Sequence, residues 1–299
     1  MYGRIASAAL ALLASGAAQG GTVEYGTAVP FRPCDGAICI QVTLSDHKPH
    51  TFLLDTSYNH SSISENVARA LGWKLTPYKS QNQVVAGLFL TDGPKPAEFA
   101  GAQGSADFLA MSPDQMGVLA KYTGTLDYTF FKDRVLQIDY KRHLIRVSQL
   151  LRPDEHPKPG KGVLKLVDFH DWGPPIVVGG PFTVDGKSLE AQIDTSYTGS
   201  LLIFSGAEKS FGFEKATEHA IVRNFPITDG GVDMLGVQVD STGFAGTVLS
   251  HPATVYFPTI KVHQPYQERF QGTVGNEFFA GTLLTLDFHD MTLDVSPAE

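Results

Sequence analysis

Hydrophobic and polar residues alternate along much of the chain in the pattern of short strands. Ile38, Ile40 and Val42 fall on one face of a strand predicted over residues 38–44, with polar or mixed residues on the other face. A turn at residues 46–48 leads into a second strand over residues 51–54. Further hairpins are predicted between residues 136–138 and 144–147, between residues 283–286 and 292–295, and, through Asp185-Gly186, before residues 189–193.

Two brief helices are predicted among these strands, over residues 62–72 and 205–212. Each begins with a serine that is followed three positions later by a glutamate, Ser62 with Glu65 and Ser205 with Glu208, which fits a capping box. The helices are short, and the 30 glycines and 18 prolines favour frequent turns. The predicted class is therefore all-β.

The start of the chain has the features of an export signal over residues 1–21. Arg4 supplies a positive charge, residues 5–13 are mostly apolar, and residues 14–18 are small. A buried first helix is the alternative, but the glycines at positions 16, 20 and 21 argue against it. The apolar run is too short to span a bilayer, and no later stretch does so. We therefore expect a periplasmic or secreted protein without stable membrane insertion.

Composition narrows the chemistry. The net charge of −8 argues against nucleic acid or an anionic membrane as a partner. In an oxidising compartment Cys34 and Cys39, the only cysteines, can close a disulfide around an Asp-Gly turn; two unrelated buried thiols are the alternative. No zinc-binding or metalloprotease motif is present, so neither a metal nor a cofactor is expected.

An internal repeat is the most informative feature of the sequence. Residues 52–58 (FLLDTSY) are echoed 139 positions later by residues 191–197 (AQIDTSY). Residues 124–131 (GTLDYTFF) are echoed by residues 272–279 (GTVGNEFF). A proline-rich, charged segment separates the two copies, which predicts an N-terminal lobe over residues 22–152, a linker over residues 153–161 and a C-terminal lobe over residues 162–299.

This repeated pattern resembles the clan of pepsin-like and retropepsin-like aspartic proteases, and most of all its bacterial two-lobed, retropepsin-like members. The resemblance covers nearly the whole chain after the export signal, once per half. It implies two pseudo-symmetric β-barrel lobes with a central cleft, in a monomer. It also implies an aspartic endopeptidase without a cofactor, which takes peptides or unfolded proteins as substrates.

Asp55 and Asp194 are the catalytic pair that the resemblance implies. Two carboxylates in close proximity cannot both ionise cheaply, so one holds a proton while the other acts as a base on a water molecule. By resemblance, Thr56 and Thr195 hydrogen-bond across the axis between the lobes. The packing motif behind the two loops is assigned to Leu126 with Asp127 in one half and to Val274 with Gly275 in the other.

The sequence departs from the family pattern at three places. Ser57 and Ser196 stand where glycine is usual, and Tyr58 and Tyr197 stand where a small residue is usual. Each tyrosine either reaches the carboxylate or packs outward. Asp127 stands where the first half is expected to have glycine, and a carboxylate there needs a partner or solvent.

These departures leave open an alternative function, a catalytically impaired relative that acts as a peptide-binding or scaffold protein. Two hairpins are candidates for lids over the cleft, one over residues 83–99 with its tip at residues 91–93, the other over residues 225–244 with its tip at residues 229–231.

Overall fold

The computed structural model describes residues 23–58, 60–80, 82–153, 160–167, 175–204, 208–212, 221–225, 232–250, 253–258 and 269–298. The predicted export signal (residues 1–21) lies outside this part of the chain, as do most of the predicted linker and residue 205 of the second capping box. Strands predominate and the helices are short, so the predicted all-β class is confirmed.

The first half of the chain forms a sheet of 10 strands. These are β2 (Arg32–Cys34), β3 (Ala37–Thr43), β4 (Pro49–Leu54), β5 (Ser61–Ser64), β6 (Leu75–Ser80), β7 (Gln83–Thr91), β8 (Lys95–Phe99), β9 (Ala102–Ala106), β10 (Phe108–Met111) and β11 (Gly124–Leu126). The short helices of this half are α1 (Glu65–Ala70), α2 (Pro113–Met116), η1 (Gly117–Lys121) and α3 (Tyr128–Phe131).

The remaining strands form a sheet of 15 strands. These are β1 (Val29–Pro30), β12 (Val135–Asp139), β13 (Leu144–Val147), β14 (Gly162–Val167), β15 (Ile176–Val184), β16 (Lys187–Ile193), β17 (Leu201–Ile203), β18 (Ile221–Phe225), β19 (Val232–Val239), β20 (Thr242–Phe244), β21 (Thr247–Ser250), β22 (Ala253–Pro258), β23 (Gly272–Val274), β24 (Thr282–Asp287) and β25 (Thr292–Pro297). The helices are α4 (Glu208–Phe211) and η3 (Asn276–Phe279).

The strand order is the same in both halves. The path β6-β7-β10-β5-β11-β4-β3 in the first sheet corresponds to β18-β19-β22-β17-β23-β16-β15 in the second. The directions agree as well: β4 runs parallel to β11 as β16 does to β23, and β5 runs parallel to β10 as β17 does to β22. The sequence repeat is thus a repeat of topology. Both paths are open, and no closed barrel is formed among the described strands.

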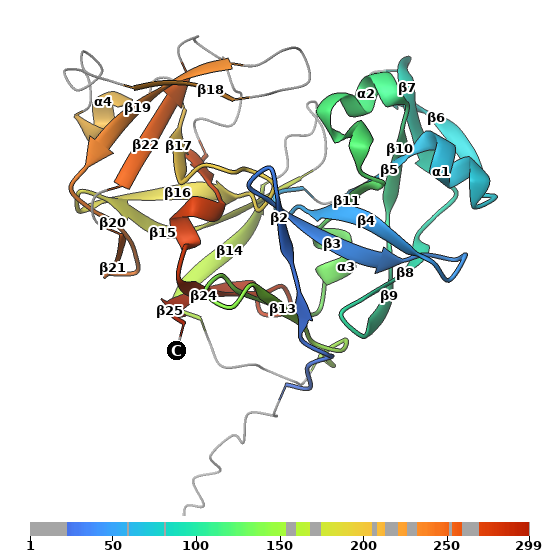
Figure 1. Ribbon diagram of the computed structural model, residues 1–299, viewed down its shortest axis with the longest axis horizontal. Coiled ribbons are helices and arrows are strands. Elements are labelled where there is room, and N and C mark those ends of the chain that lie inside the picture. The colour runs from blue at the N-terminus through green and yellow to red at the C-terminus, as the bar shows by residue number, and fades with distance from the viewer. Residues whose placement is uncertain are drawn as a thin grey trace, which may run out of the picture.

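The two halves lie side by side and are joined below by one continuous run of strands, β1-β13-β12-β24-β25-β14 (Figure 1). At its centre β12 pairs with β24, and the register is symmetric: Leu136 faces Leu286 and Ile138 faces Leu284. These residues are fully buried, so the join is part of the hydrophobic core.

The first lid candidate, residues 83–99, is not a hairpin. Its strands do not pair with each other: β7 pairs with β6 and β10, whereas β8 pairs with β3 and β9. The hairpin of this region is β6–β7, whose turn includes Asn82 in the left-handed conformation (φ 64°). In the second half the corresponding hairpin is β18–β19, and the predicted tip at residues 229–231 lies outside the described residues.

The predicted cap of the first helix is also wrong. Helix α1 begins at Glu65 with Ser64 as its N-cap residue, and no side chain caps it. Ser62 lies instead in strand β5, where its hydroxyl bonds to the hydroxyl of Thr125 (3.0 Å). The Ser62 side chain therefore forms its hydrogen bond within the sheet, to β11, and does not cap the helix.

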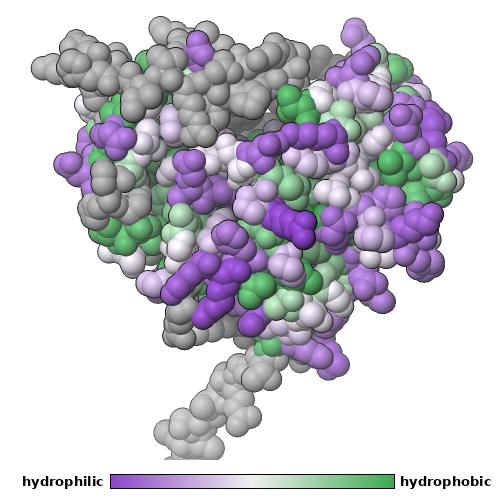
Figure 2. Space-filling model, viewed as in Figure 1, coloured by the Kyte–Doolittle hydropathy of each residue, from purple (hydrophilic) through white to green (hydrophobic). Residues whose placement is uncertain are grey.

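Eight large hydrophobic side chains are exposed in the described part of the chain. On the face drawn in Figure 2, hydrophobic residues form small separate groups among hydrophilic ones. Within the described part of the chain, no helix has the length and apolar character needed to cross a membrane.

Strands β11 and β23 pass so close to their neighbours that each begins with glycine. A Cβ on Gly124 would lie 1.9 Å from the carbonyl oxygen of Ser62, and one on Gly272 would lie 2.1 Å from that of Leu202. In each case the nearest atoms are backbone atoms of the neighbouring strand, which cannot turn aside as a flexible side chain can, so side chains are excluded at both positions.

We predict that Gly124→Ala and Gly272→Ala each lower the free energy of unfolding by about 3 kcal/mol or more, because the added methyl group forces the strands apart. Gly72→Ala is the matched control: nothing lies within 4 Å of its Cβ position, and only the left-handed φ of 74° opposes the change, which costs about 1–2 kcal/mol. Urea denaturation measures all three. Equal losses of unfolding free energy in Gly124→Ala and Gly72→Ala would show that β11 has room for a side chain at residue 124.

Candidate active site

The loops that carry Asp55 and Asp194 have the same local structure. Asp55 directly follows β4 and Asp194 directly follows β16. The backbone N–H of Asp55 donates to the carbonyl of Leu126 (3.0 Å), and that of Asp194 donates to the carbonyl of Val274 (3.0 Å). The parallel strands β11 and β23 therefore hold the two aspartates at equivalent places.

The threonines bind the two loops to each other. Thr56 donates its hydroxyl to the carbonyl of Ile193 (2.9 Å), and Thr195 donates its hydroxyl to the carbonyl of Leu54 (2.8 Å). The backbone N–H of Thr56 also donates to Oγ1 of Thr195 (3.2 Å). Both threonines are fully buried, so these bonds are shielded from water. The expected hydrogen bonding across the axis is present in the structure.

The serine in the third position of each motif donates hydrogen bonds to the aspartate of the same motif. The backbone N–H groups of Ser57 and Ser196 donate to Oδ1 of Asp55 (2.9 Å) and of Asp194 (2.8 Å). Each hydroxyl donates to the same oxygen. A hydroxyl contact with the carboxylate is thus made by the third residue of the motif.

Burial raises the pKa of both carboxyl groups above the ordinary range. It is the main cause of a pKa of about 7 for Asp55, and the negative charge of Asp194 adds to it. Burial also raises the pKa of Asp194, although donors from Ser196 and from the backbone N–H of Tyr197 (3.0 Å) oppose the rise. The site therefore keeps a proton at a pH where an exposed aspartate is ionised.

Asp127 is a third buried carboxyl group beside this pair. Its Oδ1 accepts hydrogen bonds from the hydroxyl of Ser61 (3.2 Å) and from Thr129 (3.4 Å), whereas its Oδ2 is buried without a partner among the described residues. Burial and the charge of Asp55 hold the pKa of Asp127 well above its usual value. We infer that Asp127 is neutral, because a charge there would be unpaired.

The two tyrosines adopt different environments because Asp127 replaces glycine in only one half. Tyr197 packs its ring edge over Gly275, where a Cβ would lie 2.5 Å from the ring and 2.4 Å from the Tyr197 carbonyl oxygen. Tyr58 is 43% exposed. The sequence left open whether each tyrosine reaches the carboxylate or packs outward: Tyr58 is exposed, whereas the Tyr197 ring lies against Gly199 and Gly275 and its backbone N–H contacts Asp194.

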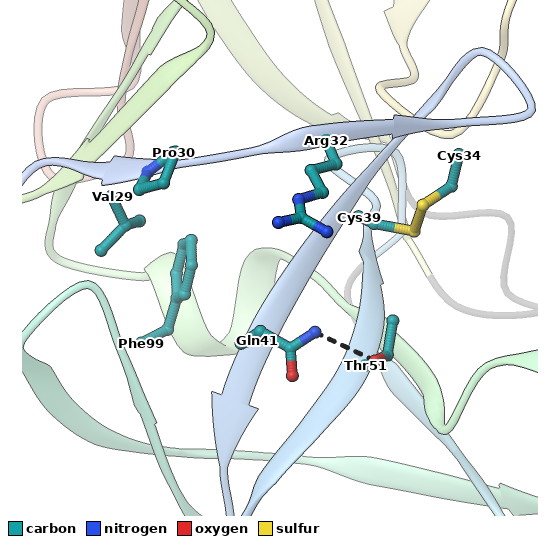
Figure 3. Close-up of a pocket in the computed structure, with 8 residues that line it drawn as sticks. All are labelled: Val29, Pro30, Arg32, Cys34, Cys39, Gln41, Thr51 and Phe99. Carbon is teal, nitrogen blue, oxygen red and sulfur yellow. Dashed lines mark hydrogen bonds between the residues drawn. A yellow bond between two sulfur atoms is a disulfide. The ribbon is translucent and has the colours of Figure 1, made fainter.

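The disulfide and a pocket lie beside each other in the N-terminal half. Cys34 and Cys39 are joined in the structure, between β2 and β3. A pocket of about 610 Å³ is lined in part by this disulfide and by Arg32, which extends between the disulfide and Phe99 (Figure 3). No residue of the two aspartate loops lines this pocket, so it is separate from the candidate active site.

Among the described residues, no group of three or more His, Cys, Asp or Glu side chains is placed to hold a metal ion. Comparison with models of known protein families and with curated proteins finds no match for this chain.

Sequence reasoning missed the polar residues that support the site. Ser61 bonds to Asp127, and Asn276 donates to the carbonyl of Thr195 (2.7 Å). Ser61 follows the first motif closely and Asn276 directly follows Gly275, so position relative to the repeat was the available signal. Nothing in the sequence indicated which atoms they would contact.

The raised pKa of Asp55 predicts a pH-dependent stability difference. Between about pH 4 and pH 7 the folded state holds a proton that the unfolded chain has lost, so this group's contribution to the free energy of unfolding falls as the pH rises. Asp55→Asn removes the effect, so relative to the variant the wild type loses up to about 1.4 kcal/mol per pH unit in this window.

Denaturation of the wild type and Asp55→Asn at several pH values measures this difference. Asp114→Asn, at an exposed position, controls for the lost negative charge. A difference that stays constant from pH 4 to pH 7, or that moves in the opposite direction, would contradict the buried, protonated state of Asp55.

Proposed function

We propose that this chain is an aspartic-type endopeptidase of the pepsin-like and retropepsin-like clan, with two pseudo-symmetric lobes in one polypeptide. The observation that carries the proposal is the reciprocal hydrogen bonding of Thr56 and Thr195, which brings two identical Asp-Thr-Ser loops together. The common strand order of the two halves and the raised pKa of both aspartates support it.

In the proposed reaction, a water molecule between Asp55 and Asp194 attacks the carbonyl carbon of a peptide bond. Asp55 holds the proton at first, because it is the more buried carboxyl group and the negative charge of Asp194 raises its pKa further. Asp194 acts as the base, because three donors from Ser196 and Tyr197 favour its ionised form. The water gives a proton to Asp194 while Asp55 protonates the carbonyl oxygen.

The rival proposal is a catalytically impaired relative that binds peptides or acts as a scaffold. The observation that favours it is Asp127, a buried carboxyl group where the other half has Gly275. Even when it is neutral, Asp127 places a third carboxyl group beside Asp55, where the other half has no side chain.

We further propose that the protein is exported, to the periplasm or outside the cell, and acts as a monomer on peptides or unfolded proteins. The disulfide is compatible with an oxidising compartment. The sequence repeat supplies both aspartates from one chain, so a second copy is not needed to complete the pair.

Removing either aspartate should abolish cleavage. We expect Asp55→Asn and Asp194→Asn each to lower kcat/KM on an unfolded protein substrate at least about a hundredfold, because the pair acts as a unit. Fluorogenic peptide cleavage measures this, with Asp114→Asn as the control. Activity that persists in Asp194→Asn, or that a metal chelator removes, would refute the proposed mechanism.

Asp127→Gly separates the two proposals. In an active enzyme, Asp127 is neutral when Asp55 titrates, so Asp127→Asn, which keeps the shape and stays neutral, should leave the alkaline limb of the kcat/KM profile unchanged. Asp127→Gly removes the carboxyl group and restores the residue type found at position 275. If the wild type is silent and Asp127→Gly cleaves, the chain is the impaired relative. If both are silent, the endopeptidase proposal fails.

A further inference from the structure

The turn closed by the disulfide lies against the loop that carries Asp194. Gly36, at the tip of the β2–β3 turn, has a φ of 88°, and a Cβ on it would lie 2.7 Å from Cβ of Thr198. Thr198 belongs to the loop that follows Asp194. The N-terminal half therefore reaches across to the C-terminal aspartate through this turn, which Figure 1 shows near the centre of the molecule.

Asn276 bridges the turn and the loop with a single amide group. Its Nδ2 donates one hydrogen bond to the carbonyl of Gly36 (3.0 Å) and one to the carbonyl of Thr195 (2.7 Å). The two hydrogens of the amide are thus divided between the two halves of the molecule. Asn276 is buried, so water does not compete strongly for either carbonyl.

Tyr140 fixes the orientation of this amide. Its hydroxyl donates to Oδ1 of Asn276 (2.9 Å), which leaves Nδ2 to face the two carbonyls. The ring of Tyr140 stacks on Phe279 at 5.7 Å and meets Phe31 edge-on at 6.1 Å. Packing therefore holds the hydroxyl in place, and all hydrogen-bonding groups of the Asn276 side chain point in defined directions.

The bridge is built in only one half of the molecule. The residue equivalent to Asn276 in the first half is Tyr128, whose ring packs edge-on against Phe288 at 5.4 Å. Tyr128 has no amide with which to bridge two carbonyls. The loop of Asp55 therefore lacks this contact, and it serves as an internal reference for the loop of Asp194.

Besides the pairing of β2 with β3 and a hydrogen bond from Tyr122 to Asp35, an ion pair and a disulfide hold the turn. Asp35 forms an ion pair with Lys121, but both side chains are largely exposed, and such pairs are weak and screened by salt. The Cys34–Cys39 disulfide closes the turn covalently, and Figure 3 shows it at the end of the β2–β3 hairpin. The disulfide is thus the stronger constraint on the position of the Gly36 carbonyl.

We propose that Asn276 is a positioning residue for Asp194, and that the Cys34–Cys39 disulfide controls it by holding the carbonyl of Gly36. A dithiol passes two electrons and two protons to the S–S bond, which yields two cysteine thiols and the oxidised cyclic reagent. The freed turn withdraws the Gly36 acceptor, so the Asn276 amide is left with only the Tyr140 hydroxyl and the Thr195 carbonyl as partners and holds the Asp194 loop less firmly. The cleavage readout rests on the proposed peptidase function.

The kinetic test compares variants that each remove one of the interactions between the disulfide turn, Asn276 and the Asp194 loop. Asn276→Asp keeps the shape and the acceptor for Tyr140 but replaces the donor, Tyr140→Phe removes the orienting hydroxyl, and Cys34→Ser with Cys39→Ser removes the disulfide. We expect kcat to fall about tenfold or more in each, with KM within about twofold, because a displaced catalytic group affects the chemical step. Dithiothreitol should lower kcat of the wild type and leave the double serine variant unchanged.

Lys121→Ala is the matched control, because it removes the exposed ion pair and leaves the disulfide intact. We expect wild-type kcat from it. Circular dichroism verifies that each variant is folded; if Asn276→Asp is unfolded, Tyr140→Phe and the double serine variant carry the test.

Amide hydrogen exchange supplies a readout that needs no cleavage. In the variants and in the reduced wild type, exchange at Ser196 and Tyr197 should be faster, while exchange at Ser57 stays unchanged. If the wild type cleaves nothing but exchange responds in this way, the peptidase proposal fails and the positioning role stands. If folded variants keep both wild-type kcat and wild-type exchange, or if both loops loosen equally, the positioning role is overturned.

Discussion

The structure depends on two hydroxyl groups that cross between its halves. The hydroxyl of each threonine, Thr56 and Thr195, donates to the carbonyl of the last residue in the strand that precedes the other loop. Buried carboxyl groups repel each other when ionised, so the loops that carry them need an attraction that does not titrate. Neutral hydroxyl–carbonyl bonds in a dry environment supply it, and the proton balance of Asp55 and Asp194 can vary while their backbone stays fixed.

Features with a local cause were readable from the sequence. The hairpin at Asp185-Gly186 was predicted because an Asp-Gly pair tolerates positive φ at both residues, and both residues have positive φ in the structure. The β6–β7 hairpin was missed because Asn82 adopts the left-handed conformation with no glycine beside it, whereas Gly93 marks a turn between strands that pair elsewhere. Ser62 was assigned to a helix cap because its alternative partner, Thr125, is distant in the sequence.

The candidate active site shows even more clearly that contacts between distant residues could not be predicted from the sequence. Tyr58 and Tyr197 occupy identical positions in identical motifs, yet one is largely exposed and the other covers a glycine. The difference arises from position 127 against position 275, which the fold brings next to them through β11 and β23. The repeat could therefore predict which residues meet, but not how a single replacement in one half would redirect its neighbours.

The pairing of β12 with β24 is symmetric. Leu136 and Ile138 are equivalent in the repeat to Leu284 and Leu286. Leu136 pairs with Leu286, and Ile138 pairs with Leu284. An edge that pairs with its own counterpart in this way is what a twofold interface between identical subunits requires. Each half thus presents to the other the surface that it would present to a second copy of itself. Joining the halves in one chain allows them to diverge, and Asp127 opposite Gly275, or Asn276 opposite Tyr128, are differences that a homodimer with the same contacts could not contain.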